Sequence, residues 1–197
     1  QDAGVEVAAL MPRICWDREW SKLEKELQEM KKLGVTQALA GTLDSARRAA
    51  QMGLEVRGDF GIGVYNSQTI KELKRMGLIS GTASFELKFS QIRDLSKAIP
   101  LEAIVYGRLP LMITENCLIE NSGQGCRCDR PNFLNDRTGA SFPLLPVFGH
   151  RTEVQNSLPV WLADRPDYRR LGLAYARLRF TTETPAECVD ILRRYQA

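Results

Sequence analysis

Residues 5–34 (VEVAALMPRICWDREWSKLEKELQEMKKLG) carry the pattern from which the fold can be predicted. The apolar run Val5–Leu10 is typical of a buried strand, and a Met-Pro-Arg loop follows it. After Asp17, the predicted helix cap, large apolar residues recur at three- and four-residue spacing as far as Met30. Gly34 then predicts the end of the helix. The stretch therefore predicts one strand followed by one amphipathic helix.

The same succession of strand and helix recurs along the rest of the chain. Further helix caps are predicted at Asp44 and Ser67, and another short helix starts at Ser90. A capping box that begins at Thr184 predicts a last helix near the end of the chain. Six strands are expected, at Val5–Leu10, Thr36–Ala40, Glu55–Phe60, Ile79–Phe85, Ala103–Tyr106 and Tyr175–Phe180.

Alternating strands and helices predict parallel strands joined by right-handed crossovers, so the expected fold class is α/β. About six parallel strands are too few for the eight that close a (β/α)8 barrel. The sequence begins at Gln1 rather than at Met, and its first strand follows almost at once. We therefore expect a partial TIM-like barrel whose first strands precede this sequence, with an open α/β sheet as the alternative.

A different pattern occupies residues 129–160. Phe133-Leu134 and Phe142–Phe148 are typical of short strands around a turn at Asn135–Gly139, which predicts an antiparallel excursion. Beyond the excursion, Leu158–Leu171 is expected to be helical. We therefore divide the chain into the barrel units with the Cys loop (residues 1–128), the antiparallel excursion (129–160) and a closing helix, strand and helix of the same domain (161–197).

Composition and charge limit the classes of partner. The net charge of +3 is small, and no long basic run suggests an obligatory nucleic-acid or membrane surface. No apolar run approaches the roughly 20 residues that a membrane-spanning helix needs, and no signal-like segment opens the sequence. We therefore expect a cytoplasmic protein with no membrane partner.

Three of the five cysteines lie within a single stretch, at Cys117, Cys126 and Cys128. The Cys-x-Cys pair can direct two thiolates to one metal, and Cys117 can supply a third ligand from one loop upstream. The only histidine, His150, is the candidate for the fourth ligand. This set suits structural zinc and would also accept an iron–sulfur cluster, in which histidine is an unusual ligand. Three free thiols in a loop are the alternative.

Polar residues follow the predicted strands at Arg13, Asp59, Asn66, Glu86, Arg108 and Glu115. The candidates for catalysis among them are Asp59, Glu86, Arg108 and Glu115. In parallel α/β folds, catalytic residues gather at the C-terminal ends of the strands. Asp59 and Glu86 end successive units, so their carboxylates are candidates for a general acid and a general base. For each carboxylate, a structural role as a cap of a helix or loop is the alternative. Neither a Gly-x-Ser-x-Gly elbow nor a His-Glu-x-x-His motif is present.

Several motifs together resemble one known family. The most specific is Tyr106-Gly-Arg-Leu-Pro-Leu-Met, with Glu115-Asn-Cys117 after it. Supporting motifs are Gly58-Asp-Phe-Gly, Tyr65-Asn-Ser, Ser84-Phe-Glu-Leu, Asp136-Arg-x-Gly before Phe142-Pro, and Arg151-Thr-Glu-x-x-Asn-Ser. The sequence resembles the collagenase-like peptidase family, the thirty-second of the peptidase families of unassigned catalytic type. The similarity covers nearly the whole chain, as the C-terminal part of the family's barrel.

The resemblance implies peptide-bond hydrolysis, because the family takes its label from collagen-degrading members. It also implies an alternative, since other relatives bind a 4Fe–4S cluster through four cysteines and assist hydroxylation of RNA bases or of the ubiquinone ring. The ligands that match here are Cys117 and either Cys126 or Cys128. Gly149-His150-Arg151 stands where a further cysteine is expected, so this chain departs from the four-cysteine pattern.

Three functions therefore stand as hypotheses. The first is a peptidase that uses strand-end carboxylates or a metal-bound water, and the second is an iron–sulfur protein that assists hydroxylation of an RNA base or a quinone ring. The third is a non-catalytic fragment of a barrel. The expected cofactor is a 4Fe–4S cluster or zinc. The expected partners are a peptide or RNA substrate, and either the N-terminal remainder of the barrel or a second copy in a homodimer.

Overall fold

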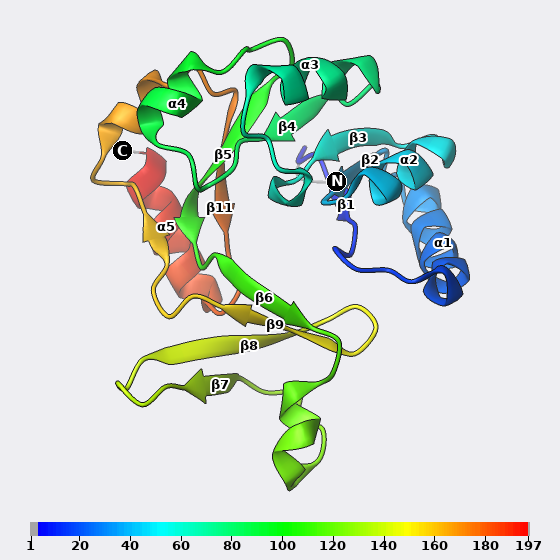
Figure 1. The fold of residues 1–197 in the computed structure, drawn as a ribbon, viewed down its shortest axis with the longest axis vertical. Coiled ribbons are helices and arrows are strands. Elements are labelled where there is room, and N and C mark those ends of the chain that lie inside the picture. Colours follow the sequence, from blue (N-terminus) through cyan, green and yellow to red (C-terminus); the bar gives the residue numbers. More distant parts are fainter. Residues whose placement is uncertain (1–3, 197) are drawn as a thin grey trace. The chain divides into compact units, whose positions relative to one another are not determined.

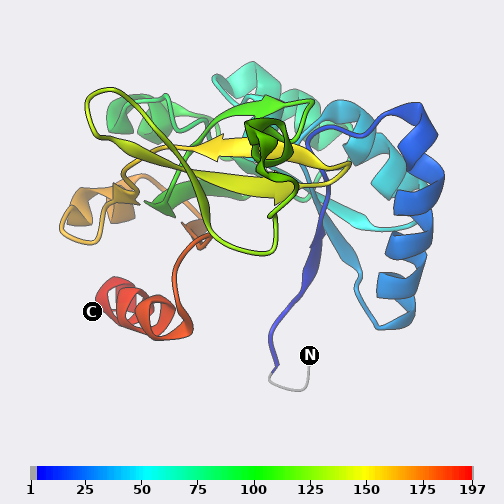
Figure 2. The same ribbon diagram turned by 90° about the horizontal axis from the view of Figure 1, so that it is seen from below.

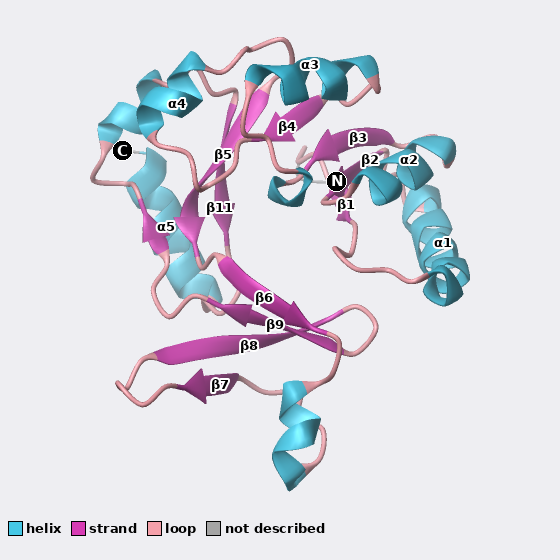
Figure 3. Cartoon of the chain, in the orientation of Figure 1, coloured by secondary structure: helices cyan, strands magenta, loops and turns pink. Residues whose placement is uncertain are grey.

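The computed structural model describes residues 4–196, which form two compact units. The first unit contains the described residues up to Ala103 together with Asp167–Ala176, and the second contains Ile104–Pro166 and the described residues from Arg177 onward. Figure 3 shows that helices and strands alternate in the first unit, whereas the strands of residues 110–155 form a sheet of their own. The three ranges drawn from the sequence stay a prediction.

Six parallel strands form one sheet (Figure 1). Its first five strands pair in chain order and are β1 (Ala8–Leu10), β2 (Gln37–Ala40), β3 (Glu55–Gly58), β4 (Ser80–Thr82) and β5 (Leu101–Gly107). The sixth strand, β11 (Tyr175–Arg179), also pairs with β5, and the backbone N–H of Ala174 donates to the carbonyl of Leu101 at 2.8 Å. These strands confirm the α/β class and the partial TIM-like barrel.

Four helices connect the strands of the first unit, and they are α1 (Asp17–Lys32), α2 (Leu43–Gln51), α3 (Ser67–Arg75) and α4 (Phe89–Asp94). Helices α1 and α2 lie on one face of the strands that they connect (Figure 1, Figure 2). Helix α1 buries Trp20, Leu23 and Leu27, as the spacing predicts. The helix burial therefore follows from the sequence pattern.

The predicted caps are wrong by one or two residues, because the structure has its N-caps at Trp16, Thr42 and Asn66. The side chain of Thr42 accepts the backbone N–H of Ser45, and Asn66 accepts two N–H groups of the first turn of α3. These side chains satisfy donors that have no partner inside the helix. The residues that follow them, Leu43 and Ser67, are already helical.

The second unit contains a four-stranded antiparallel sheet with the order β6-β9-β8-β7 (Figure 1). Its strands are β6 (Pro110–Thr114), β7 (Asn132–Asn135), β8 (Ser141–Val147) and β9 (Arg151–Gln155). β7 and β8 confirm the antiparallel excursion, whereas β6 and β9 were not predicted. Strand β9 is buried along its whole length although it contains Arg151, Glu153 and Gln155. Because its sequence is polar, β9 does not show the apolar pattern expected of a central, buried strand.

The expected helix at Leu158–Leu171 is wrong. This range contains β10 (Val160–Trp161), which pairs antiparallel with β5, and a short 3-10 turn, η3 (Pro166–Arg170). Two prolines in the range lack the N–H donor that a helix interior needs. The last predicted helix is confirmed as α5 (Pro185–Gln196), whose capping box joins Thr184 and Glu187. Among residues 4–196, no helix has the length and the apolar character needed to cross a bilayer.

Candidate metal centre

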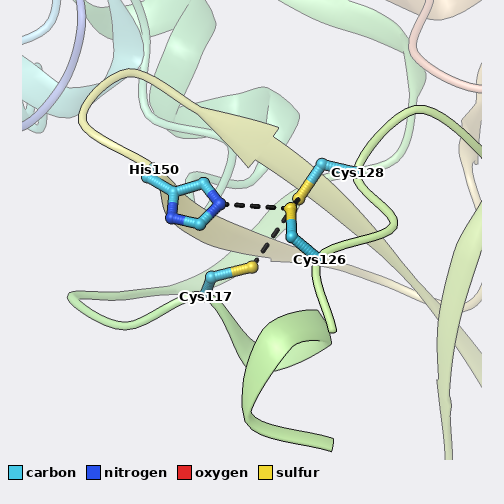
Figure 4. A group of neighbouring side chains, drawn as sticks. All are labelled: Cys117, Cys126, Cys128 and His150. Atoms are coloured by element: carbon cyan, nitrogen blue, oxygen red, sulfur yellow. Dashed lines mark hydrogen bonds between the residues drawn. The ribbon is translucent and has the colours of Figure 1, made fainter. Parts of the chain in front are cut away.

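Cys117, Cys126, Cys128 and His150 point toward one another in the second unit (Figure 4). Their ligand atoms all lie within 4.8 Å of one another. The Sγ atom of Cys128 lies 3.2 Å from Sγ of Cys126 and 3.6 Å from Sγ of Cys117. Nε2 of His150 lies 3.3 Å from Sγ of Cys126. The structure thus brings together the four ligands expected from the sequence, and metal binding itself stays a prediction.

Cys117 lies between β6 and a short helical turn, η2 (Glu120–Gln124). The backbone N–H of Glu120 donates to Sγ of Cys117 at 3.4 Å, and Asn121 donates to its carbonyl at 3.1 Å. Burial raises the pKa of the Cys117 thiol, but hydrogen bonds from Glu120 and Cys128 and further contacts hold it below its ordinary value. The position therefore favours the thiolate, which is the form that binds metal.

Cys126 and Cys128 lie on the loop that joins η2 to β7. The side-chain amide of Asn132, the first residue of β7, donates to the carbonyls of Arg127 at 2.8 Å and Arg130 at 2.6 Å. The hydrogen bond with Cys126, followed by burial, raises the pKa of Cys128 to about 12. A metal ion bound here would therefore displace the proton of Cys128.

His150 lies in the three-residue loop between β8 and β9. Its φ of 60° is uncommon for a residue with a Cβ, and Gly149 before it has a φ of 76°. Nδ1 of His150 lies 3.7 Å from a carboxylate oxygen of Glu120. A carboxylate beside one ring nitrogen leaves the other nitrogen for the metal, as is usual for metal-binding histidines. Sequence reasoning missed Glu120, whose signal is its place three residues after Cys117.

The cluster lies at the surface of the second unit and is anchored to its interior through Cys117, since Cys126 and His150 are exposed and Cys128 is half-buried. Cys117 packs with Ile119, Leu144 and Val154 in one buried apolar cluster, and Cys128 packs against it. The buried hydroxyl of Thr152 in β9 accepts the backbone N–H of Leu118 at 3.1 Å. A metal held by these thiols would therefore link the ligand loops to the central strand of the sheet.

In the first unit, Asp59 directly follows β3, whereas Glu86 lies four residues after the end of β4. Asp59 is 3% exposed, and its Oδ1 accepts the backbone N–H of Phe60 at 2.8 Å at the start of a 3-10 turn. Glu86 is exposed and accepts the hydroxyl of Tyr65 at 2.8 Å. The rings of Phe60 and Phe85 lie 5.6 Å apart, so the segments that carry the two carboxylates are neighbours. Their catalytic roles stay a prediction.

Arg108 and Glu115 lie in the second unit. Nε and Nη2 of Arg151 donate to the two oxygens of Glu115 at 2.8 Å and 3.0 Å, which makes a bidentate ion pair. Nη1 of Arg108 donates to the carbonyl of Asn156 at 3.0 Å and to that of Ser157. These contacts are structural, and the catalytic roles expected for both residues stay a prediction.

Comparison with known proteins found one family. The sequence profile described as Peptidase family U32 matches residues 1–130, which is well over half of the 197 residues. No curated protein matches the chain, and no solved structure does. The matched range includes the three clustered cysteines and ends before His150.

Proposed function

The chain belongs to peptidase family U32, and we propose that it hydrolyses peptide bonds while a single zinc ion stabilises its antiparallel unit. One observation carries the zinc site, namely the spacing of the four ligand atoms within 4.8 Å. Family membership and the strand-end carboxylates support the hydrolysis. The two parts are tested separately.

The spacing of the sulfurs supports one ion rather than a cluster. Thiolates that bind zinc at about 2.3 Å in a tetrahedral arrangement lie about 3.8 Å from each other. The distances of 3.2 Å and 3.6 Å from Cys128 to the other two sulfurs are close to this value. In a 4Fe–4S cluster each ligand binds a different iron, so the sulfurs are separated by the width of the cluster. The His150 ligand also suits zinc better than iron–sulfur chemistry.

Four protein ligands make the proposed zinc site structural. A catalytic zinc keeps one position open for water, whereas a closed Cys3His set leaves none. The residues that catalyse hydrolysis are then those of the first unit, where Asp59 and Glu86 lie on neighbouring segments. One carboxylate takes a proton from the water that attacks the peptide carbonyl, and the other, in its acid form, gives a proton to the departing amine.

Metal analysis of protein purified without oxygen tests the zinc site. We expect one zinc per chain, a colourless preparation and, after exchange into cobalt, the visible bands of a tetrahedral thiolate-rich site. Iron with sulfide in a brown preparation, absorbing near about 400 nm, would contradict the proposal.

Hydrolysis of casein or gelatin tests the reaction. Asp59→Asn and Glu86→Gln each remove a proton-transfer group and should lower the rate about 100-fold or more. Glu72→Gln is the matched control, because Glu72 is a surface carboxylate of α3 paired with Arg75. Full activity in both the Asp59 and the Glu86 variants would rule out these carboxylates.

The three clustered thiols also favour a second candidate, an iron–sulfur protein that assists hydroxylation of an RNA base or a quinone ring. This candidate expects iron and sulfide in the anaerobic protein and their loss in Cys117→Ser. The contacts of Asp59 with Phe60 and of Glu115 with Arg151 favour the third hypothesis, a non-catalytic barrel fragment. A folded, zinc-loaded protein with no hydrolysis would support that reading.

A further inference from the structure

Arg108 follows the last residue of β5, and the protein uses only one side of its guanidinium. Nη1 donates to the carbonyls of Asn156 and Ser157. Nε is buried and has no hydrogen-bond partner among residues 4–196. Within the same residues, Arg108 forms no ion pair with a carboxylate. The residue as a whole is half-buried, but a shielded guanidinium nitrogen without a partner is uncommon, because buried polar groups are normally hydrogen-bonded.

Other arginines of the chain show what the free edge of Arg108 is suited to bind. In Arg151, Nε and Nη2 bind the two oxygens of Glu115. The same two nitrogens bind a carboxylate in two further ion pairs, Arg75–Glu72 and Arg93–Asp94. This edge of the guanidinium matches the two oxygens of a carboxylate in geometry and in charge. In Arg108 the corresponding edge begins with the unpartnered Nε.

The neighbouring charges do not neutralise Arg108. Arg179 donates to the carbonyl of Arg108 at 2.6 Å and to Oε1 of Gln155 at 2.6 Å. Nη2 of Arg179 donates to Glu153 at 2.7 Å, and Glu153 is 4% exposed. The buried acid therefore balances Arg179. The positive charge of Arg108 is left without an acid in contact with it.

We propose that Arg108 binds a carboxylate of the peptide substrate through Nε and Nη2. A bidentate carboxylate would satisfy the buried Nε and balance the charge. Arg108 also stands at the C-terminal end of a parallel strand, where folds of this class bind their ligands. The inference names the substrate class of the proposed peptidase and in that sense rests on it, but its test measures binding and needs no turnover.

Nuclear magnetic resonance titrations with three short peptides test the proposal. The peptides are acetyl-triglycine acid, its C-terminal amide, and acetyl-Gly-Glu-Gly amide, which separate a terminal carboxylate from a side-chain carboxylate. The wild type should bind at least one of the acids about tenfold or more tightly than the neutral amide, because a charge-assisted bidentate pair is strong. Arg108→Gln should remove that preference and leave binding of the neutral amide unchanged.

Two variants keep the result clear. Arg108→Lys keeps the positive charge but lacks the two parallel N–H donors of a guanidinium, so it should retain only part of the preference for the acids. The proposal can be tested with this variant if Arg108→Gln does not fold. Arg137→Gln removes an exposed arginine from the turn between β7 and β8 and should change nothing. Equal binding of acid and amide by the wild type, or an intact preference in Arg108→Gln, would overturn the proposal.

Inorganic phosphate is the last probe. If phosphate displaces the acids more effectively than the acids displace each other, the site selects anions in general and the assignment to peptide carboxylates fails. Loss of hydrolysis with an intact carboxylate preference would overturn the proposed peptidase and leave this inference standing. Intact hydrolysis with no carboxylate preference would do the reverse.

Discussion

The two units are stabilised in different ways. Among its described residues, the first unit buries one charged side chain, Asp59, and otherwise packs apolar helix faces on parallel strands. The antiparallel sheet of the second unit buries Arg151 and Glu153 in its central strand, and the apolar cluster of this sheet is small and includes a candidate metal ligand. Apolar burial alone can stabilise the first unit. The antiparallel sheet needs its charge pairs and, on our proposal, its metal.

Removal of the metal should therefore act on one unit only, and this is the largest effect that we expect. Structural zinc contributes apparent free energies of about 10–16 kcal/mol in small zinc-binding peptides, which is more than a small apolar cluster can supply. Chelation, or Cys117→Ser, should remove the hydrogen-exchange protection of β6 to β9 and leave that of β1 to β4 intact. Hydrogen exchange followed by mass spectrometry measures both.

Cys188→Ser is the matched control for this experiment, because Cys188 lies on α5 and outside the cluster. It should leave the protection of both units unchanged. If β6 to β9 stay protected without metal, the buried ion pairs stabilise these strands without it. The two units would then differ in their buried charges and not in a dependence on metal.

Leu27→Ala should show the opposite selectivity. Leu27 is 2% exposed on the inner face of α1, and truncation of such a leucine costs about 3 kcal/mol. The loss should be the same with and without metal, and it should appear in the protection of β1 to β4. Leu33→Ala is the control, since Leu33 is 78% exposed just after the same helix. A metal-dependent loss in Leu27→Ala would show that the units are not independent.

The same contrast explains which parts could be predicted from the sequence. In the first unit, apolar spacing and glycines near each other in the chain determine the strands and helices, and the cap errors arose where Thr42 and Asn66 compete with a nearby Asp or Ser. Strand β9 could not be predicted, because the partners that allow Arg151 and Glu153 to be buried, Glu115 and Arg179, are distant in sequence. No local pattern reports a distant partner.

The ligands of the candidate metal centre could be predicted from the sequence, because their residue types are sufficient to identify them. The Cys-x-Cys spacing and the presence of a single histidine identify ligands from residue type alone. Glu120 could not be predicted, because its role depends on the loop that places His150 next to it in the fold. Residue chemistry therefore identifies the ligands, and only the fold identifies the groups that orient them.

Glu115→Ala tests whether ion pairs carry stability in the second unit. The change leaves Arg151, which is 1% exposed, without its bidentate carboxylate. We expect a loss of about 2 kcal/mol, below the usual cost of breaking a buried pair, because the Glu115 side chain is 50% exposed. Urea unfolding measures it, with the solvent-exposed Glu72–Arg75 pair as control, where Glu72→Ala should change nothing measurable.

The result also separates stability from catalysis. Loss of stability with unchanged hydrolysis per folded molecule would contradict the catalytic role expected for Glu115 from its strand-end position. Loss of hydrolysis in a fully stable variant would instead support that role. It would also show that the Glu115–Arg151 ion pair does not contribute to the stability of the second unit.

Glu120→Ala should have the narrowest effect, a change in metal affinity alone, because the Glu120 side chain contacts the site only beside His150. Its carboxylate lies 3.7 Å from Nδ1 of His150, and removal of such a partner lowers metal affinity about 10- to 100-fold. The cobalt spectrum should keep its thiolate bands, since the four ligands are unchanged. Glu120→Gln should lose less affinity, because it keeps an oxygen acceptor on the Nδ1 side of His150. Asp129→Asn removes a negative charge beside Cys128 without touching His150. Equal losses in the Glu120 and Asp129 variants would mean that general charge, and not orientation of His150, sets the affinity.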